Sequence, residues 1–257
     1  RSLLAIMGPS GCGKSTLLKS LNGESPPTKG KVLIFNQDLI SNYEYLKTQI
    51  GYVPQDDIVH KQLTVEQSLY FAAKLRIANI NNDDINIKID QILSELNISH
   101  IKKNLISDIS GGQRKRVSIA IELLTDPMLL FLDEPTSPLD PQTIEDFLNI
   151  LKKLSENGTT VIMVTHKPED LDYMDEVIFM ADNNGGKIVY YGDSTKYKDY
   201  FNVNNAVSVF SQISGSNSKK WVDKYSNPRP LSTTQDREKI LVNKSNQSSV
   251  GQFFWLT

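Results

Sequence analysis

Apolar residues occur along the chain in two patterns, as short continuous runs and as runs that repeat at helical spacing. A short continuous run bounded by turn residues is typical of a strand buried on both faces of a parallel sheet. The runs predict strands at residues 3–7, 31–35, 50–53, 128–132, 160–165, 177–180 and 187–191. Helices are predicted at residues 15–22 and from residue 141 to about 156, where Asn157-Gly158 is typical of a helix end.

Between these strands the chain has a long stretch of helical character, from about residue 57 to 125. Thr64 is a suitable N-cap for a helix whose apolar positions are Val65, Leu69, Ala73 and Ile77. A second amphipathic helix is marked by Ile85, Ile89, Ile92, Leu93 and Leu96. No heptad repeat connects the two, which excludes a long coiled coil. Strands that alternate with helices predict an α/β fold with a mostly parallel sheet and a helical insertion.

The C-terminal part of the chain differs in composition. Residues 202–249 are rich in Asn, Ser and Lys, which predicts a lightly packed polar extension or linker. Residues 252–257 are apolar and aromatic, which indicates that the chain was cut where another part begins. We therefore expect one domain over residues 1–200 and an extension over residues 201–257.

Composition and charge narrow the classes of function. The 257 residues are 39% hydrophobic, which is enough for a core, and the formal net charge of −2 provides no overall attraction for nucleic acid. The single cysteine, Cys12, excludes an internal disulfide and suits a reducing compartment. No secretory signal is visible, and no apolar run approaches the roughly 18 residues of a membrane span. We expect the chain as given to be soluble.

The most specific motif follows the first predicted strand. Its residues are Gly8, Pro9, Ser10, Gly11, Cys12, Gly13, Lys14, Ser15 and Thr16, in the spacing of a phosphate-binding P-loop. Glycines let backbone N–H groups turn toward a phosphate, and the helix N-terminus adds unpaired donors. Lys14 is expected to reach the β- and γ-phosphates of a nucleoside triphosphate, Ser15 to bind Mg²⁺, and Thr16 to cap the helix or contact the α-phosphate. Cys12 is either a reactive thiol or, as we favour, a small residue that fits the loop.

Two carboxylates, Asp133 and Glu134, follow the buried run at residues 128–132. Ligands of open α/β sheets bind at the carboxyl ends of the strands. Asp133 is suited to hold Mg²⁺ through water, and Glu134 to polarise an attacking water. An acidic residue after a strand is often only a helix cap, but two of them beside a P-loop favour a functional site.

A third motif, Ser110-Gly111-Gly112-Gln113, opens a predicted helix that continues with Arg114-Lys115-Arg116. Three cations in a first helical turn oppose the helix dipole, which makes sense if this end faces a multiply charged anion. The alternative is a glycine-rich helix entry with a solvated basic face. Beside the P-loop and the two carboxylates, the anion-binding interpretation is the stronger one.

Taken together, these motifs resemble those of ATP-binding cassette (ABC) ATPase domains over roughly residues 1–200. The resemblance is carried by the P-loop, by Gln55 in Tyr52-Val53-Pro54-Gln55, by Ser110 to Gln113, by Asp133-Glu134, by Ser137-Pro138-Leu139-Asp140 and by His166. It implies a P-loop NTPase core with a small antiparallel β part. It also implies that two cassettes pack head to tail, so that ATP on one P-loop is closed by the Ser110, Gly111, Gly112 and Gln113 loop of the other.

The resemblance further implies roles for single residues. Gln55 would sense Mg²⁺ and the attacking water and couple to a membrane domain, and His166 would contact the γ-phosphate. Asp140 would lie across the dimer interface. The residues alone also allow simpler interpretations, because a single histidine is more often structural and Asp140 before Pro141 is a good helix cap.

The closer resemblance is to cassettes of the G-subfamily type and related bacterial half-transporters, in which the membrane domain follows the cassette. Its carriers are residues 110–118, residues 122–127 and the end of the chain at residues 252–257, which resembles the start of a connecting helix. This resemblance implies a C-terminal transmembrane domain in the same natural chain, at the cytoplasmic face of the membrane.

Two departures from the family pattern stand out. Pro138 occupies a position where a small residue is usual, and proline stiffens a loop by fixing φ. Only seven residues precede Gly8, so the aromatic residue that stacks on adenine and the first strands of the antiparallel part are absent. We expect weaker ATP binding as a result, because stacking of a base on an aromatic ring is worth roughly 1–3 kcal/mol.

The sequence therefore predicts a Mg²⁺-dependent ATPase that powers transport through a membrane domain, with Lys14, Gln55, Glu134 and His166 as its catalytic residues. The nearest alternative is a soluble cassette protein that acts on DNA or the ribosome, which usually has a second cassette, a coiled coil or a zinc insertion. A P-loop kinase would not need Ser110 to Gln113. A catalytically weak regulatory module is disfavoured by the intact set of motif residues.

Overall fold

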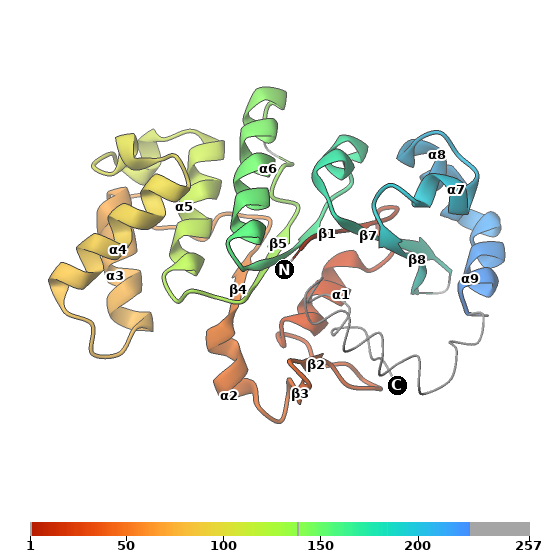
Figure 1. Cartoon of the computed structure of the whole chain (residues 1–257), viewed down its shortest axis with the longest axis horizontal. Helices are drawn as coiled ribbons and strands as arrows, with labels where there is room; N and C mark the ends of the chain where they lie inside the picture. The colour runs from red at the N-terminus through yellow and green to blue at the C-terminus, as the bar shows by residue number, and fades with distance from the viewer. Residues whose placement is uncertain (1, 138, 184, 227–257) are drawn as a thin grey trace.

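The structure, a computed structural model, describes residues 2–137, 139–183 and 185–226 of the chain. Its centre is a six-stranded sheet in the order β4-β5-β6-β1-β7-β8 (Figure 1). The strands are β1 (Leu3–Met7), β4 (Ile50–Val53), β5 (Leu129–Asp133), β6 (Thr160–Val164), β7 (Glu176–Asp182) and β8 (Gly186–Asp193). All neighbours pair in parallel except β7 and β8. The predicted α/β fold with a mostly parallel sheet is confirmed.

A small antiparallel sheet joins β2 (Leu33–Ile34) to β3 (Gln37–Asp38). A single strand was predicted over residues 31–35, but only its centre is extended. The chain turns back at Phe35 and Asn36, whose φ angles of 51° and 60° are those of a tight hairpin turn. The antiparallel part expected from the family resemblance is therefore present as this hairpin.

Helices cover both faces of the main sheet. They are α1 (Lys14–Leu21), α2 (Tyr43–Leu46), α3 (Val65–Arg76), α4 (Asn82–Glu95), α5 (Gly111–Leu123), α6 (Pro141–Glu156), α7 (Tyr197–Phe201), α8 (Ala206–Ile213) and α9 (Ser218–Ser226). Short 3-10 turns lie at Lys47–Gln49, Ser99–Ile101, Ile106–Asp108, Pro168–Tyr173 and Gly215–Asn217. In Figure 1, α6 lies above the sheet and α1 below it.

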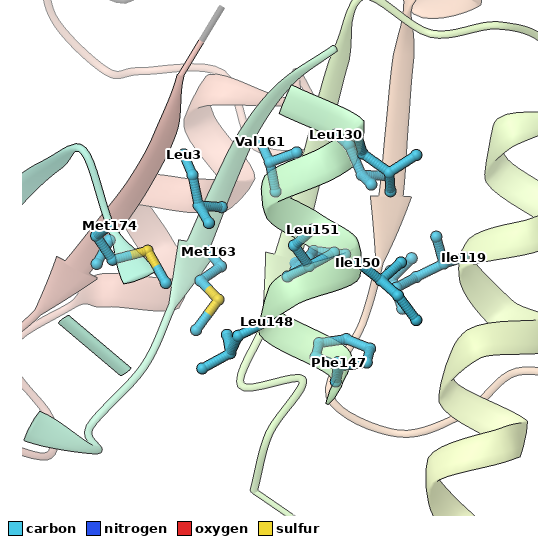
Figure 2. Packing of buried hydrophobic residues seen from close by; sticks show 14 of the residues in the cluster. Leu3, Ile119, Leu130, Phe147, Leu148, Ile150, Leu151, Val161, Met163 and Met174 are labelled. Carbon is cyan, nitrogen blue, oxygen red and sulfur yellow. The ribbon is translucent and has the colours of Figure 1, made fainter. Parts of the chain in front are cut away.

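The core is divided by the sheet because side chains along a strand point alternately to its two faces. On one face, Leu3 and Met163 pack with Leu148 and Leu151 of α6 (Figure 2). On the other face, Leu4 and Ile6 pack with Leu18 of α1. Fully burying an apolar side chain contributes about 1.5–3 kcal/mol, so packing on both faces holds the strands firmly in place. The predicted site residues follow the carboxyl ends of these strands and are positioned by them.

The helices α3, α4 and α5 gather at one side of the sheet (Figure 1). Thr64 caps α3 as predicted, since its hydroxyl accepts from the Gln67 N–H while the Gln67 side chain accepts from the Thr64 N–H. The predicted apolar positions Leu69 and Ile89 are fully buried between α3 and α4. The helical insertion is therefore a packed layer whose apolar side chains continue the core on one face of the main sheet.

The segment from residue 202 differs from the lightly packed linker that was predicted there. Its described part forms α8 and α9, which contact β7 and β8. Trp221 of α9 is only 6% exposed, and its ring lies 4.7 Å from that of Phe201. The polar composition hid an apolar face, in which Val209 and Ile213 are fully buried. Residues 227–257, including the predicted connecting segment at 252–257, lie outside the described residues, and the division of the chain at residue 200 stays a prediction.

Within the described ranges, no helix combines the length and the apolar character that crossing a bilayer requires.

Candidate nucleotide site

The P-loop connects the end of β1 to the start of α1 at the carboxyl edge of the sheet. Gly13 stands at the N-cap of α1 with φ 90°, a left-handed conformation that suits glycine, and Gly11 has φ 80°. Because Gly13 has no side chain, it makes no capping hydrogen bond to the first turn. The N–H groups at the start of α1 are thus left to bind an anion, as in other phosphate sites at helix N-termini.

Lys14 is the buried cation of this loop. Its side chain is curled over the loop, and its Nζ donates to the carbonyl oxygens of Gly8 and Pro9, both at 3.0 Å. The residue is 7% exposed, and no ion pair among the described residues includes it. A buried ammonium without an anionic partner is costly. The loop therefore fits the phosphate groups of a nucleotide.

The back of the P-loop lies against the β7–β8 hairpin. A Cβ atom added to Gly186 would lie 2.1 Å from the Cys12 carbonyl oxygen, and one added to Gly8 would lie 2.3 Å from the Met180 carbonyl oxygen. Cys12 is fully buried, and its burial raises the pKa of its thiol. Both observations favour Cys12 as a small residue that fits the loop over a reactive thiolate.

Ser15 and Asp133 form a pair of oxygen ligands beside the P-loop. The Ser15 hydroxyl donates to Asp133 Oδ1 at 3.1 Å, and Asp133 is 6% exposed at the end of β5. Burial raises the pKa of Asp133, the hydrogen bond from Ser15 lowers it, and the charge of Glu134 raises it again. A buried carboxylate and a hydroxyl are the donors that Mg²⁺ takes in P-loop proteins, and its charge would offset the cost of this burial. The pair therefore fits the ion.

Glu134 is the point where three strand ends converge. Gln55, two residues after β4, donates from Nε2 to Glu134 Oε2 at 3.3 Å. His166, two residues after β6, places Nδ1 at 3.5 Å from the same oxygen. Glu134 itself has φ 46°, a conformation that a non-glycine residue adopts at a cost, and its N–H donates to the Val164 carbonyl. The structure thus brings together the predicted residues Gln55, Glu134 and His166.

Ser110 and Asp140 stand apart from this group. Within the described residues, no hydrogen bond or ion pair joins them to the P-loop or to Glu134. Ser110 and Gln113 form a reciprocal capping box at the start of α5, at 3.0 and 3.2 Å. Asp140 caps α6 by accepting from the Thr143 N–H at 3.1 Å, and its hydrogen bonds to Thr143 lower its pKa. Both residues therefore cap helices, a role that the sequence allowed for Asp140 and that the structure adds for Ser110.

The first two basic side chains that follow Ser110 to Gln113 make a hydrogen bond and an ion pair within this chain. Arg114 donates to the Ile109 carbonyl at 2.7 Å, and Lys115 pairs with Asp57 at 2.8 Å. Burial lowers the pKa of Arg116. The expectation that all three cations serve a bound anion is therefore not met by Arg114 and Lys115. A search by motif could not reveal this, because Asp57 is distant in sequence.

A buried acid that sequence reasoning missed connects two loops of the site. Asp170 is fully buried and accepts from the Thr136 hydroxyl at 3.0 Å and the Thr165 hydroxyl at 2.5 Å. Burial raises its pKa, and the two hydroxyl groups lower it. Lys167 adds a bond to the Thr136 carbonyl at 2.6 Å. These contacts fix the loop after Glu134 against the loop that contains His166.

An apolar groove lies between α3 and the segment that follows Gln55. It has a volume of about 570 Å³ and is lined by Ile58, Val59, His60, Gln62, Leu63, Ser68, Phe71, Ala72, Leu75, Arg76 and Ile121. Three of its large side chains are exposed, namely Ile58 at 82%, Phe71 at 51% and Leu75 at 87%. Apolar side chains gathered in this way on a surface are typical of an interaction site.

Known proteins are similar in sequence to this chain. A family model described as ABC transporter matches residues 1–137. The chain is 41% identical over 212 residues to the ABC transporter ATP-binding/permease protein Rv1747 of Mycobacterium tuberculosis, an alignment that covers 82% of this chain and 24% of that protein. It is 40% identical over 209 residues to the broad substrate specificity ATP-binding cassette transporter ABCG2 of Mus musculus, with coverage of 77% and 31%. The chain thus spans about a quarter to a third of the length of these relatives.

A solved structure shares the fold as well. It is cbiO1 of Clostridium perfringens, described as part of the ABC transporter complex cbiONQ, which is 32% identical to this chain at a TM-score of 0.69. The alignment covers 78% of this chain and 79% of cbiO1.

Proposed function

Because the chain belongs to the ABC transporter family, as a nucleotide-binding domain, we propose that it hydrolyses ATP to ADP and phosphate with Mg²⁺. The observation that carries the proposal is the convergence of Gln55 and His166 on Glu134, next to the Ser15–Asp133 pair. Two adjoining carboxylates thereby have different surroundings, one bonded to the P-loop serine and one facing an amide and an imidazole. Such a difference is what separate roles in metal binding and water activation require.

The roles follow from these surroundings. Lys14 and the N–H groups at the start of α1 would hold the phosphates and stabilise the charge that develops on the transferred group. Ser15 and Asp133 would hold Mg²⁺, which would offset the negative charge of the phosphates when bound. Glu134, with its side chain 21% exposed, would orient a water and accept its proton. Gln55 would orient the same water, and His166 would contact the γ-phosphate.

We propose a second cassette as the partner at Ser110 to Gln113. The start of α5 is closed on itself by the capping box and has no bond to the P-loop of its own chain among the described residues. A head-to-tail pair would place this end, with its positive dipole, against nucleotide on the other subunit. Asp140 would lie at the same interface.

We propose a transmembrane domain as the partner at the apolar groove. The groove begins with Ile58, three residues after Gln55, so an occupant would contact the segment that also reaches Glu134. The relatives support this occupant, because one is called an ATP-binding/permease protein and another belongs to a transporter complex. In this proposal the domain sits at the cytoplasmic face of a membrane, and the membrane partner is C-terminal in the same natural chain.

The test is phosphate release from Mg-ATP by the wild-type chain and by Glu134→Gln, with nucleotide binding followed by calorimetry. We expect the variant to bind ATP with unchanged affinity and to lose turnover by about 10²- to 10⁴-fold, the usual contribution of a general base. Lys152→Gln is a control, because this lysine pairs with Asp175, which directly precedes β7 at the end of the sheet away from the P-loop. Turnover by Glu134→Gln at the wild-type rate would refute the role of Glu134, and absence of ATP binding by the wild-type chain would refute the function.

A further inference from the structure

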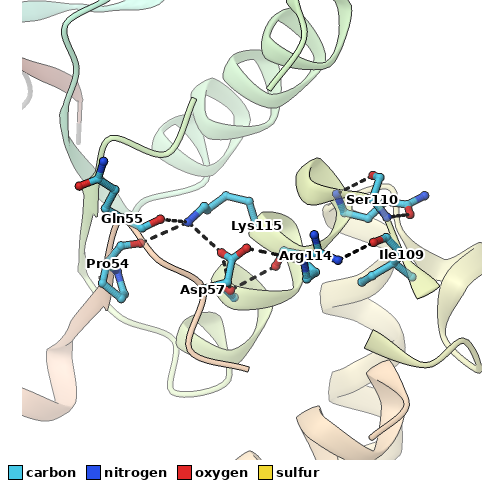
Figure 3. A network of polar contacts seen from close by, with 9 residues as sticks. Pro54, Gln55, Asp57, Ile109, Ser110, Arg114 and Lys115 are labelled. Carbon is cyan, nitrogen blue, oxygen red and sulfur yellow. Dashed lines mark hydrogen bonds and ion pairs between the residues drawn. The ribbon is translucent and has the colours of Figure 1, made fainter. Parts of the chain in front are cut away.

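A buried cation connects α5 to the segment that contains Gln55. The side chain of Lys115 is 1% exposed. Its Nζ donates to the carbonyl oxygens of Pro54 at 3.2 Å and Gln55 at 2.9 Å, and it pairs with Asp57 Oδ1 at 2.8 Å (Figure 3). An ammonium group has three donors, and all three are used by one short segment of chain. We call residues 54–57 the glutamine loop.

Two further side chains from the first turns of α5 lie close to the Asp57 carboxylate. Ser118 donates to Asp57 Oδ1 at 3.3 Å, and Arg114 Nε lies 4.0 Å from Asp57 Oδ2. Arg114 is held in turn by the Ile109 carbonyl, immediately before Ser110 (Figure 3). Polar contacts in a buried setting have specific geometry, so the glutamine loop is fixed to α5 in one arrangement.

We propose that Lys115 is a positioning residue that couples the Ser110 to Gln113 end of α5 to the catalytic group around Glu134. Lys115 holds the main-chain carbonyl of Gln55, while the side chain of the same residue donates to Glu134. The capping box at Ser110 lies about one helical turn before Lys115. A shift of this helix end therefore moves Gln55 relative to Glu134.

This inference rests on the proposed function, in which Ser110 to Gln113 binds nucleotide held by a second cassette. The link through Lys115 then makes occupation of the other subunit's site adjust the catalytic geometry of this subunit's own site. The two ATP sites become coupled, and coupling of this kind is reciprocal. Ile58, directly after Asp57, lines the apolar groove, so a partner docked there acts on the same loop.

The variant that tests the link is Asp57→Asn combined with Lys115→Met. Removing one partner of a buried ion pair leaves an uncompensated charge, whereas this double variant removes both charges at similar volume. Its readouts are kcat, KM and the Hill coefficient for ATP. We expect kcat to fall about 10- to 100-fold, as for a misplaced catalytic group, with KM within about threefold and a Hill coefficient reduced from above 1 to about 1.

The matched control is Asp90→Asn combined with Lys102→Met. This ion pair has a separation of 2.6 Å, also joins a lysine to an aspartate, and lies in the helical insertion, where Lys102 pairs with Glu66 as well, at 3.4 Å. Among the described residues, no hydrogen bond or ion pair joins Asp90 or the Lys102 side chain to the glutamine loop. It is expected to keep the wild-type kcat and Hill coefficient. If Asp57→Asn/Lys115→Met also keeps both, Lys115 only stabilises the fold and the inference is wrong, while the ATPase function stands.

A second measurement leaves the ion pair intact and applies even if the double variant does not fold. Hydrogen exchange of Glu134→Gln is compared with and without Mg-ATP, before and after adding Ser110→Arg. We expect ATP to protect residues 54–57 and 110–118 together, and Ser110→Arg to abolish both changes while the P-loop stays protected. Full protection of residues 54–57 in the Ser110→Arg variant would overturn the inference. Absence of ATP-dependent protection at the P-loop would instead refute the proposed function.

Discussion

Gly186, in the β7–β8 hairpin, lies directly against the P-loop although it is outside every predicted motif. We therefore expect a substitution at Gly186 to disturb the P-loop. In Gly186→Ala, the new Cβ would lie 2.1 Å from the Cys12 carbonyl oxygen, where real Cβ atoms essentially never approach within 3.0 Å. It would also lie 2.9 Å from the Met180 Cε. The methionine end can move aside, but the backbone carbonyl of the P-loop cannot do so alone.

Relief of this overlap requires the P-loop and the hairpin to separate by about 0.9 Å. Overpacking of this kind typically costs about 1–3 kcal/mol in the free energy of unfolding. For a domain of this size, Tm falls by roughly 2–4 °C for each kcal/mol. A displacement near 1 Å at a substrate-positioning loop can reduce the rate about 10²-fold. We therefore expect a modest loss of Tm with a large loss of kcat.

The assay is phosphate release at saturating Mg-ATP, beside a calorimetric melt. Gly192→Ala is the control in the same strand, because the three atoms nearest its Cβ would all belong to the Tyr190 side chain, with the hydroxyl oxygen nearest at 3.1 Å. That side-chain end can shift by a few tenths of an ångström, so activity should stay within about twofold. If Gly186→Ala matches wild type in kcat and Tm, the hairpin does not hold the P-loop in place.

Two further predictions concern parts of the fold that the sequence did not reveal. Trp221→Ala should lower the free energy of unfolding, measured by chemical denaturation, by about 3–5 kcal/mol, because a buried ring would be removed from a well-packed cluster. An effect below about 0.5 kcal/mol would show that α9 does not contribute to the stability of the domain. Burial raises the pKa of Asp170 in the folded state above its value in the unfolded state, about 3.9. The protonated side chain therefore contributes stability that is fully present below about pH 3.9. This stability is lost as the pH rises through the folded pKa. Relative to Asp170→Asn, wild type should therefore lose stability over that rise, and parallel pH profiles of the two proteins would contradict this account.

The strands of the sheet could be predicted because buried parallel strands are continuous apolar runs, and β1 and β4 were placed to the residue. The positions of Lys14, Ser15 and Glu134 followed from motif spacing, since local loop geometry determines which residue types bind phosphate and metal. The roles of these residues stay predictions until they are tested.

The features that were missed depend on contacts between distant segments. Nothing local distinguishes Lys115, fully buried, from the exposed lysines of a basic helix face, because its partner Asp57 comes from another loop. Asp170 looks like a solvated acid in a polar turn, yet two threonines from separate loops enclose it. In α8 and α9, an average over polar composition concealed the few apolar positions that pack against β7 and β8.

The most direct test of the central claim, an ATP-driven pair of cassettes, is light scattering of Glu134→Gln with and without saturating Mg-ATP, with saturation established by calorimetry. The account predicts a shift from monomer to dimer with nucleotide, and loss of that shift when Ser110→Arg is added. A chain that binds ATP to saturation and stays monomeric would contradict it.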